Sequence, residues 1–155
     1  MVKPGSVAIV GAAELVNSDG RLPHLSQLGI HAESAIRAMA EAGIGPMDID
    51  GVACAGASPT EVAWYLGIVP KYVDGTSVGG CSFMLHVRHA VAAIESGLCR
   101  TVLITHGESG RSGIGRGGFG GGRQTLAGQF EQWAGPMGAP TSFTIPVMRF
   151  MKPVA

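Results

Sequence analysis

Short apolar runs alternate with stretches of helical periodicity along the first two-thirds of the chain. Apolar runs lie at 7–10, in "IDGVACAG", in "KYVDGTSVGG" and in "RTVLITHGES", and each has the length of a strand. Helical patterns separate them, between Ser26 and Gly43, in "PTEVAWYLGI" and over 81–97. Strands buried on both faces of a parallel sheet read as continuous apolar runs. We therefore expect an α/β fold, a mostly parallel sheet with helices on both faces.

Two of the expected helices have a clear apolar stripe. One stripe in the helix after Ser26 consists of Leu28, Ala32, Ala35, Ile36 and Met39. The helix expected over 81–97 is the best patterned, because its apolar residues recur at steps of three and four: Met84, Val87, Val91, Ile94 and Leu98. Gly97 suits the carboxyl end of that helix.

Composition excludes several classes of protein. Hydrophobic residues make up 46% of the 155 residues and charged residues 14%, which favours a globular domain over a disordered chain. The formal net charge is zero and no basic block occurs, so we expect no nucleic-acid binding. No apolar run approaches the roughly 20 residues needed to cross a bilayer, and no signal peptide is recognisable, so a cytoplasmic protein is expected.

The last third of the chain loses the alternating pattern. Glycine is concentrated over 107–122, where "GRGGFG" matches the G-x-G-x-x-G motif of dinucleotide sites. That motif should follow the first strand and open a helix, and here it does neither, so we interpret it as a loop. The segment "TSFTIPVMRFMK" predicts a last helix, broken near Pro146. We expect a core at 1–109 and a glycine-rich loop with a terminal helix at 110–155, in a chain that looks truncated.

Cys81 is the strongest candidate for a functional residue. It follows Gly79 and Gly80 and is expected at the start of the helix over 81–97. Unpaired amides and the helix dipole stabilise a thiolate there, and two glycines leave space for a substrate carbonyl. The alternative is an ordinary small buried cysteine. Cys54, inside an apolar run, and Cys99, beside another, are interpreted as structural residues, since the three cysteines form no C-x-x-C pair.

Other polar residues are weaker candidates. His86 and His89 are three residues apart on the same expected helix, but no third ligand accompanies them, so we expect no metal site. Glu108 closes the last apolar run, and ligands of open α/β sheets bind at the carboxyl ends of strands. It could therefore orient groups in a site, or it could be a structural acid that binds loop amides.

The pattern resembles the N-terminal half of the thiolase superfamily. The resemblance lies in "SVAIVGAAE", "DGVACAG", "GGCSFMLHVRHAVAAIESGLCRTVLITHGES" and "GPMGAPTSFTIPVMRFMK". The last segment is similar to the lipid-transfer, sterol-carrier-protein thiolase and thiolase-like branch. The resemblance implies a fold of two packed halves that share central helices, one of them the helix that begins at Cys81. It also implies lipid metabolism and a homo-oligomer.

Residue by residue, Cys81 matches the acyl-accepting cysteine of the family. The resemblance thus implies an acyl-CoA thiolase or acetyltransferase that forms a cysteine acyl-enzyme from a coenzyme A thioester, with no tightly bound cofactor. The family's histidines and second cysteine lie in its C-terminal half and have no match here. Bulky Phe83 and Met84 stand where the family has small residues. Two alternatives stay open: a carbon–carbon lyase acting with a small acyl-CoA-binding partner protein, and a non-catalytic binding module.

Overall fold

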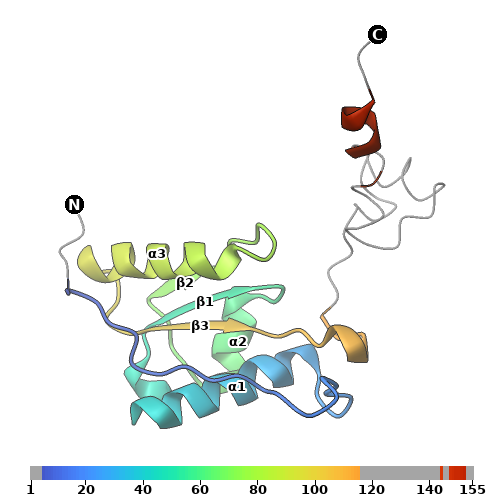
Figure 1. Ribbon diagram of the computed structural model, residues 1–155. Coiled ribbons are helices and arrows are strands. Elements are labelled where there is room, and N and C mark those ends of the chain that lie inside the picture. The colour runs from blue at the N-terminus through green and yellow to red at the C-terminus, as the bar shows by residue number, and fades with distance from the viewer. Residues whose placement is uncertain (1–4, 116–143, 145–146, 153–155) are drawn as a thin grey trace. The chain divides into compact units, whose positions relative to one another are not determined.

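The computed structural model describes residues 5–115, 144 and 147–152 (Figure 1). The chain divides into two units, Met1–Arg116 and Gly117–Ala155, and each is described by itself. The first unit contains three strands and three α-helices. In chain order the elements are α1 (Gln27–Ala42), the 3-10 turn η1 (Pro46–Asp48), β1 (Gly51–Ala55), α2 (Pro59–Leu66), β2 (Tyr72–Asp74), α3 (Ser82–Glu95), β3 (Val102–His106) and the 3-10 turn η2 (Gly110–Ser112).

The three strands form one parallel sheet in the order β2-β1-β3. Gly51 of β1 is paired with Tyr72 of β2 on one side and with Val102 of β3 on the other. Helix α3 covers one face of the sheet, and α1 and α2 cover the opposite face (Figure 1). Parallel strands need crossover connections, and α2 and α3 provide them here. The expected α/β class, with helices on both faces of a parallel sheet, is confirmed.

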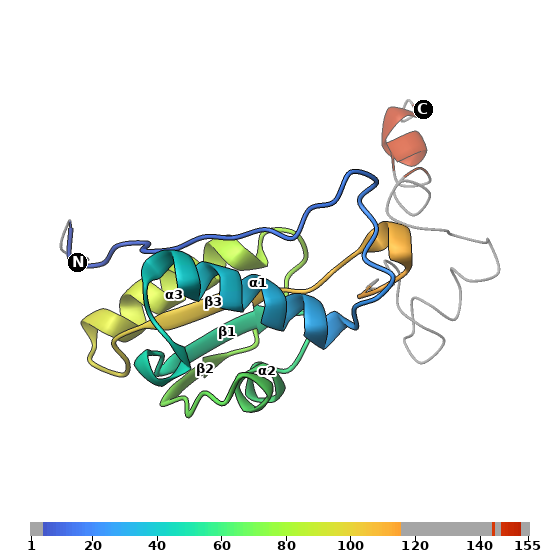
Figure 2. The ribbon, with the colours of Figure 1, turned by 90° about the horizontal axis from the view of Figure 1, so that it is seen from below.

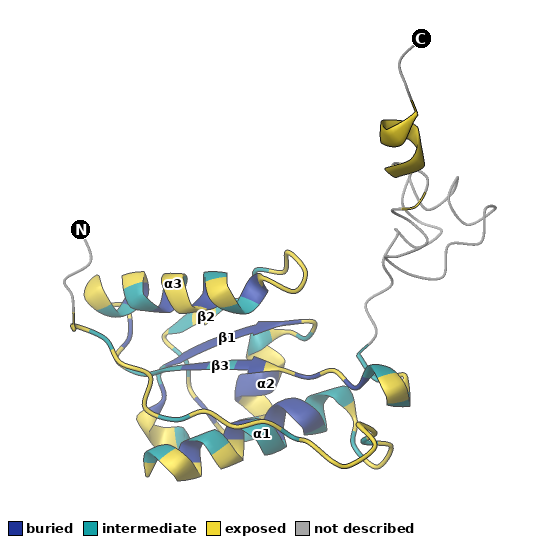
Figure 3. Ribbon diagram, viewed as in Figure 1, coloured by how far each residue is buried: buried dark blue, intermediate teal, exposed yellow. Residues whose placement is uncertain are grey.

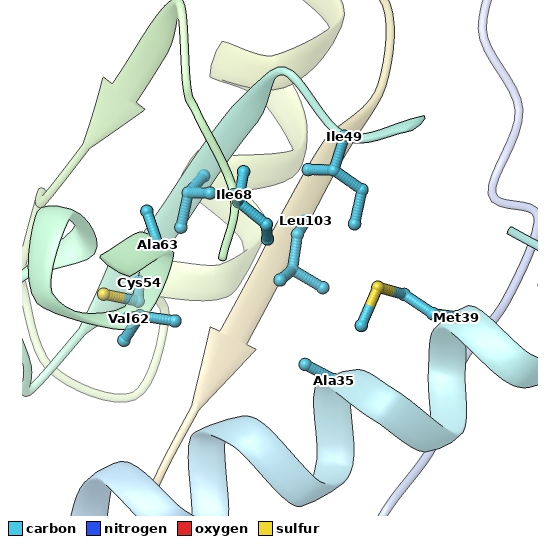
Figure 4. Packing of buried hydrophobic residues seen from close by; sticks show 9 residues of the cluster. Ala35, Met39, Ile49, Cys54, Val62, Ala63, Ile68 and Leu103 are labelled. Atoms are coloured by element: carbon cyan, nitrogen blue, oxygen red, sulfur yellow. The ribbon is translucent and has the colours of Figure 1, made fainter. Parts of the chain in front are cut away.

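The core lies between the sheet and the pair α1 and α2 (Figure 4). All five residues of β1 are buried, which explains why this strand is apolar without alternation. The residues that pack around it come from α1, α2, β3 and the segments beside them: Ala35, Met39, Ile49, Val62, Ala63, Ile68 and Leu103. Removing this apolar surface from water is the main force that holds the layers together.

Helix α1 begins and ends at the expected residues. The Ser26 hydroxyl caps it by accepting a 3.0 Å hydrogen bond from the Gly29 amide. Gly43 ends it with φ of 69°, a left-handed conformation that favours glycine. Its buried face departs from the expected stripe, because Ile30 and His31 are buried while Ile36 is 56% exposed. The polar His31 is tolerated inside because Thr105 on β3 binds its ring.

The strand expected at 7–10 is absent. This segment runs along the outside of the domain, past α1 and α3 (Figure 2), and Ile9 is 80% exposed. Side chains of the two helices hold its flanks: Glu95 accepts a hydrogen bond from the Ser6 hydroxyl, and Glu41 accepts one from the Ala12 amide. An apolar run becomes a strand only where a neighbouring strand pairs with it, and no described strand does so here.

Helix α3 turns its apolar stripe outward rather than toward the sheet (Figure 3). Met84 is 75% exposed and Leu98, just beyond the helix, is 56% exposed. The face that packs on the sheet consists of small and polar residues instead: Ser82, His86, Ala90 and Ala93. Small residues let the helix approach the strands closely. The opposite, apolar side of α3 is left exposed.

Near the end of the chain, Thr144 and 147–151 are helical, in agreement with the last predicted helix. Most of the "GRGGFG" segment lies outside the described residues. In the part of the chain that the structure describes, no helix is long and apolar enough to span a bilayer.

Candidate functional site

The carboxyl ends of β1 and β3 meet the start of α3 at one edge of the sheet. β3 ends at His106, and its ring packs against that of Phe83 from the first turn of α3, with 4.7 Å between ring centroids. The start of α1 reaches the same edge, where the Gln27 amide donates a 3.0 Å hydrogen bond to the Gly56 carbonyl. Ligands of parallel sheets bind at this edge, so it is the candidate site.

Cys81 is the N-cap residue of α3, and its side chain is exposed. Its thiol donates a long hydrogen bond, 3.7 Å, to the Val78 carbonyl. The preceding glycines have different roles. Gly79 has φ of 87°, which only glycine adopts readily, whereas Gly80 has an ordinary φ, and a Cβ on it would meet nothing within 4 Å. Space in front of the sulfur therefore does not depend on Gly80.

The amides at the start of α3 are only partly free. The Ser82 amide donates a 3.0 Å hydrogen bond to the Gly79 carbonyl, and the Met84 amide donates one of 3.1 Å to the Cys81 carbonyl. The buried Ser82 hydroxyl also binds this loop, because it donates to the Gly79 carbonyl at 2.6 Å and accepts from the Val78 amide at 3.0 Å. The loop before Cys81 is thus fixed to the helix, and the expected row of unpaired amides is reduced by two.

The side chains of His106 and Glu108 are in hydrogen-bond contact at the end of β3. Nε2 of His106 lies 3.1 Å from Oε2 of Glu108, and Nδ1 lies 3.3 Å from the Ala55 carbonyl oxygen. The His106 side chain is 37% exposed and that of Glu108 is 45% exposed, so both are accessible. Of the two interpretations left open for Glu108, this contact favours the orientation of a neighbouring group.

His31 lies behind this pair in the protein interior. Its Nδ1 lies 2.8 Å from the Thr105 hydroxyl, while its Nε2 is buried and has no hydrogen-bond partner. Burial, and secondly the charge of the nearby His106, lower the pKa of His31 to about 4. His31 is therefore neutral at physiological pH.

His86 and His89 do not share a ligand. His86 is buried, and its Nε2–H donates to the Thr76 carbonyl at 2.9 Å. Nδ1 of His89 lies 2.7 Å from the carboxylate of Asp74, the last residue of β2. Over residues 5–115, 144 and 147–152, no three potential metal ligands come together.

Cys54 and Cys99 are buried, as expected of structural cysteines. Burial raises the pKa of the Cys54 thiol to about 11 and also raises that of Cys99. Both are therefore protonated near neutral pH, and both are inaccessible, whereas Cys81 is exposed.

Two surface clefts flank the sheet. The larger, about 570 Å³, lies at the amino ends of the strands beside Asp50, Lys71 and Arg100. The smaller, about 410 Å³, has Glu108, Ser109 and Arg111 on its wall. Glu108 connects the smaller cleft with the carboxyl edge of the sheet, whereas Cys81 and His106 do not line it.

Comparisons with known proteins agree with this fold. No family model matches the chain. A steroid side-chain-cleaving aldolase of Thermomonospora curvata is 32% identical over 119 residues, which are 73% of this chain and 29% of the aldolase. The Ltp2-ChsH2(DUF35) aldolase has a similar structure, with a TM-score of 0.69 and 27% identity over 97% of this chain and 39% of its own. A monomeric SCP2-thiolase-like protein from Mycobacterium smegmatis matches with a TM-score of 0.52 and 25% identity, over 62% of this chain and 22% of its own.

The fold of this chain is therefore thiolase-like. The resemblance to the N-terminal half of the sterol-carrier-protein thiolase and thiolase-like branch is confirmed. The chain spans only 29%, 39% and 22% of the lengths of these three proteins. Two of these three similar proteins are named as aldolases.

Sequence reasoning did not identify His31 or His106 as site residues. A signal for His106 was present, since it is a polar residue at the carboxyl end of an apolar run and stands two positions before Glu108. No pattern marks His31, because it lies beside the expected apolar stripe of α1, and its partner Thr105 comes from a distant strand.

Proposed function

We propose that this chain is part of a thiolase-like carbon–carbon lyase, an aldolase that cleaves a β-hydroxyacyl thioester of coenzyme A. The observation that carries the proposal is the 32% identity to a steroid side-chain-cleaving aldolase over 73% of this chain. The structural similarity to a second aldolase supports the same reaction class. Since the chain spans 29% and 39% of these relatives, the activity is proposed for the protein in its assembled form.

The contacts of Cys81 within the described residues are compatible with an aldolase, and they do not test an acyltransferase, whose histidines the family carries in its C-terminal half. A cysteine nucleophile needs a base within hydrogen-bond reach. In the described part of the chain the only hydrogen bond of the Cys81 thiol is to a backbone carbonyl. The nearby His106 ring packs against Phe83, which lies two residues after Cys81. Cleavage of a carbon–carbon bond requires proton transfer but no acyl-enzyme, so it does not need an activated thiol.

A small acyl-CoA-binding partner protein is part of this proposal. The name of the similar Ltp2-ChsH2(DUF35) aldolase pairs two components. Met84 and Val87 on the outward apolar stripe of α3 are exposed, so this stripe provides an apolar surface to which another protein could bind. A homo-oligomer, which the resemblance implies, is proposed as well, and light scattering of the purified chain tests it.

To test the proposal, the full chain is incubated with a β-hydroxyacyl-CoA in which the carbon that carries the hydroxyl group is tertiary. The reaction is run with and without the ChsH2(DUF35) protein, and mass spectrometry follows the ketone and the shortened acyl-CoA. We expect cleavage only with the partner present, and unchanged cleavage in Cys81→Ser. No ketone under either condition, or loss of cleavage in Cys81→Ser, would contradict the aldolase proposal.

Acyl transfer through Cys81 is the second candidate, because the thiol is exposed at the N-terminus of α3. It predicts one acetyl group on the intact protein after incubation with acetyl-CoA. The group should be absent in Cys81→Ser and retained in Cys54→Ser, which removes a buried thiol. An acetyl adduct with these properties, without carbon–carbon cleavage, would favour this candidate over the aldolase.

A further inference from the structure

We propose that the smaller surface cleft binds the apolar acyl end of the substrate, and that Glu108 accepts a hydrogen bond from the substrate hydroxyl group. This inference rests on the proposed function, because it states which part of the β-hydroxyacyl thioester the cleft holds. The volume of the cleft, about 410 Å³, is within the range of small-molecule sites, about 300–1,000 Å³.

Hydrogen bonds between the two walls of the cleft fix its shape. One wall precedes α1 and the other follows β3. The Leu22 amide donates a 2.8 Å hydrogen bond to the Ser112 hydroxyl, and the Arg111 guanidinium donates one of 2.9 Å to the Asp19 carbonyl. A Cβ on Gly20 would stand 3.5 Å from the Arg111 side chain, so the walls are in contact there. Because the cleft is formed in advance, a ligand loses less free energy to ordering of the protein.

One side of the cleft is apolar, although it lies on the surface. Leu15, Val16 and Leu22 line it, and Val16 is 70% exposed. An apolar ligand that covers this side removes hydrocarbon surface from water, which favours binding. The turn beside it is ordered, because the Asn17 side chain accepts a 3.0 Å hydrogen bond from the Arg21 amide. The apolar side is therefore available to a hydrocarbon chain or ring.

The other side of the cleft is polar and carries a net negative charge. Its ionisable side chains are Glu14, Glu108 and Arg111, which are two carboxylates against one guanidinium. The excess of negative charge disfavours the phosphate groups of coenzyme A and favours an uncharged ligand with a hydrogen-bond donor. The acyl end of a β-hydroxyacyl thioester is such a ligand, since it is uncharged and its hydroxyl group can donate.

Glu108 is the residue through which the cleft reaches the carboxyl edge of the sheet. Its Oε2 lies 3.1 Å from Nε2 of His106, and its Oε1 has no hydrogen-bond partner among the described residues. A carboxylate offers about four lone-pair positions, so it can accept from a ligand hydroxyl while the contact with His106 remains. A ketone in place of the hydroxyl cannot donate. Glu108 thus determines specificity for a hydroxylated ligand.

A binding experiment tests the cleft without catalysis. The full chain, labelled with ¹⁵N, is titrated with 1-adamantanol and with 2-adamantanone, two uncharged cage compounds that carry a hydroxyl and a ketone. We expect the amide signals of Leu22, Gly110 and Arg111 to shift. The alcohol should bind about tenfold more tightly, the lower range for a hydrogen bond to a charged group. Glu108→Gln should reduce this preference to less than about threefold, because the acceptor loses its charge.

Val16→Ser tests the apolar side, and Val69→Ser is its matched control. Val69 is another exposed valine, at 82%, and it lies outside the cleft. We expect Val16→Ser to weaken both probes by the same factor, about threefold or more, because serine removes apolar contact surface. Val69→Ser should bind both probes as the wild type does.

Two results of the titration would contradict the inference. Absence of shifts at the cleft amides with both probes would overturn it, whether or not the protein cleaves carbon–carbon bonds. Equal affinities of the wild type for the alcohol and the ketone would overturn the assignment of Glu108.

A cleavage assay with the same β-hydroxyacyl-CoA and the partner protein connects the cleft to the proposed function. We expect Val16→Ser to raise KM by about threefold or more and to leave kcat within about twofold of the wild type, as loss of uniform binding does. An unchanged KM in Val16→Ser, with an active wild type, would overturn this inference and leave the aldolase proposal intact. An inactive wild type would contradict the aldolase proposal, while the titration would still decide whether the cleft binds a hydroxylated apolar ligand.

Discussion

Gly107 lies directly against the buried ring of His31. A Cβ on Gly107 would stand 2.8 Å from Nε2 of His31 and 2.6 Å from the backbone carbonyl oxygen of Gln27. Both distances are shorter than normal contacts, and the backbone of α1 cannot move without disturbing its packing on β3. The glycine that follows His106 is therefore required for the close approach of β3 to α1 at the candidate site.

We expect Gly107→Ala to lower the free energy of unfolding by about 1–3 kcal/mol, the usual cost of overpacking a tight site. Urea denaturation followed by circular dichroism measures it. Gly110→Ala is the control, because Gly110 has no positive φ and its Cβ would meet nothing within 4 Å. Equal unfolding midpoints for the two variants would show that the close contact with His31 does not exclude a Cβ at position 107.

The three cysteines should differ sharply in reactivity. Cys81 is exposed, while Cys54 and Cys99 are buried and the pKa of Cys54 is raised to about 11. At pH 8 we expect one thiol to react quickly with iodoacetamide and the other two only after addition of denaturant. Peptide mass spectrometry identifies the modified residue. Rapid modification that persists in Cys81→Ser would contradict the structure, and Cys99→Ser should leave the fast reaction unchanged.

The comparison of sequence and structure shows what local patterns can and cannot predict. The bounds of α1 followed from Ser26 and Gly43, because capping and left-handed backbone are local requirements. The segment 7–10 was wrongly predicted as a strand, because a strand depends on a pairing partner that periodicity does not reveal. The stripe of α3 was real, but its direction was not predictable, since small residues on the opposite side pack on the sheet.

The candidate site was only partly predictable for a related reason. The position of Cys81 at the start of α3 could be predicted, because the two preceding glycines and the apolar periodicity after it are local sequence features. The pairing of His106 with the Ala55 carbonyl depends on the register of β3 against β1, which brings residues 51 positions apart into contact. Register is a property of the whole sheet, so the sequence indicated Glu108 as a candidate without indicating its partner.

The carboxylate of Asp74 should make stability depend on acidic pH. Partial burial raises the pKa of Asp74, but hydrogen bonds from the Thr76 hydroxyl and amide and from His89 outweigh it, so the pKa falls from 3.8 to about 2. A lowered pKa contributes stability that is complete above pH 3.8 and is lost as pH falls toward 2. Such a shift corresponds to about 2 kcal/mol at neutral pH.

We therefore expect Asp74→Asn to lower the free energy of unfolding at pH 7 and to differ less from the wild type at pH 2.5. Urea unfolding at both pH values measures the difference. Glu14→Gln is the control, since Glu14 is exposed. A deficit of Asp74→Asn that is as large at pH 2.5 as at pH 7 would show that ionisation is not the source of the stability.

Asp50 connects the amino ends of all three strands. Its Oδ1 accepts hydrogen bonds from the Arg100 and Thr101 amides at 2.7 and 3.0 Å, just before β3 begins. Its Oδ2 lies 3.3 Å from Nζ of Lys71, just before β2 begins. The two kinds of contact differ in strength. The carboxylate accepts charge-assisted hydrogen bonds from two adjacent backbone amides, whereas the Lys71 side chain is 70% exposed and water weakens its ion pair.

We expect Asp50→Ala to lower the free energy of unfolding by about 1–3 kcal/mol, because it leaves two amides without an acceptor. Lys71→Ala removes only the exposed ion pair and should cost less than about 1 kcal/mol. Urea denaturation of both variants gives the comparison, and hydrogen exchange of the Arg100 and Thr101 amides should accelerate only in Asp50→Ala. A larger loss in Lys71→Ala would mean that the ion pair, rather than the amide contacts, joins the strand ends.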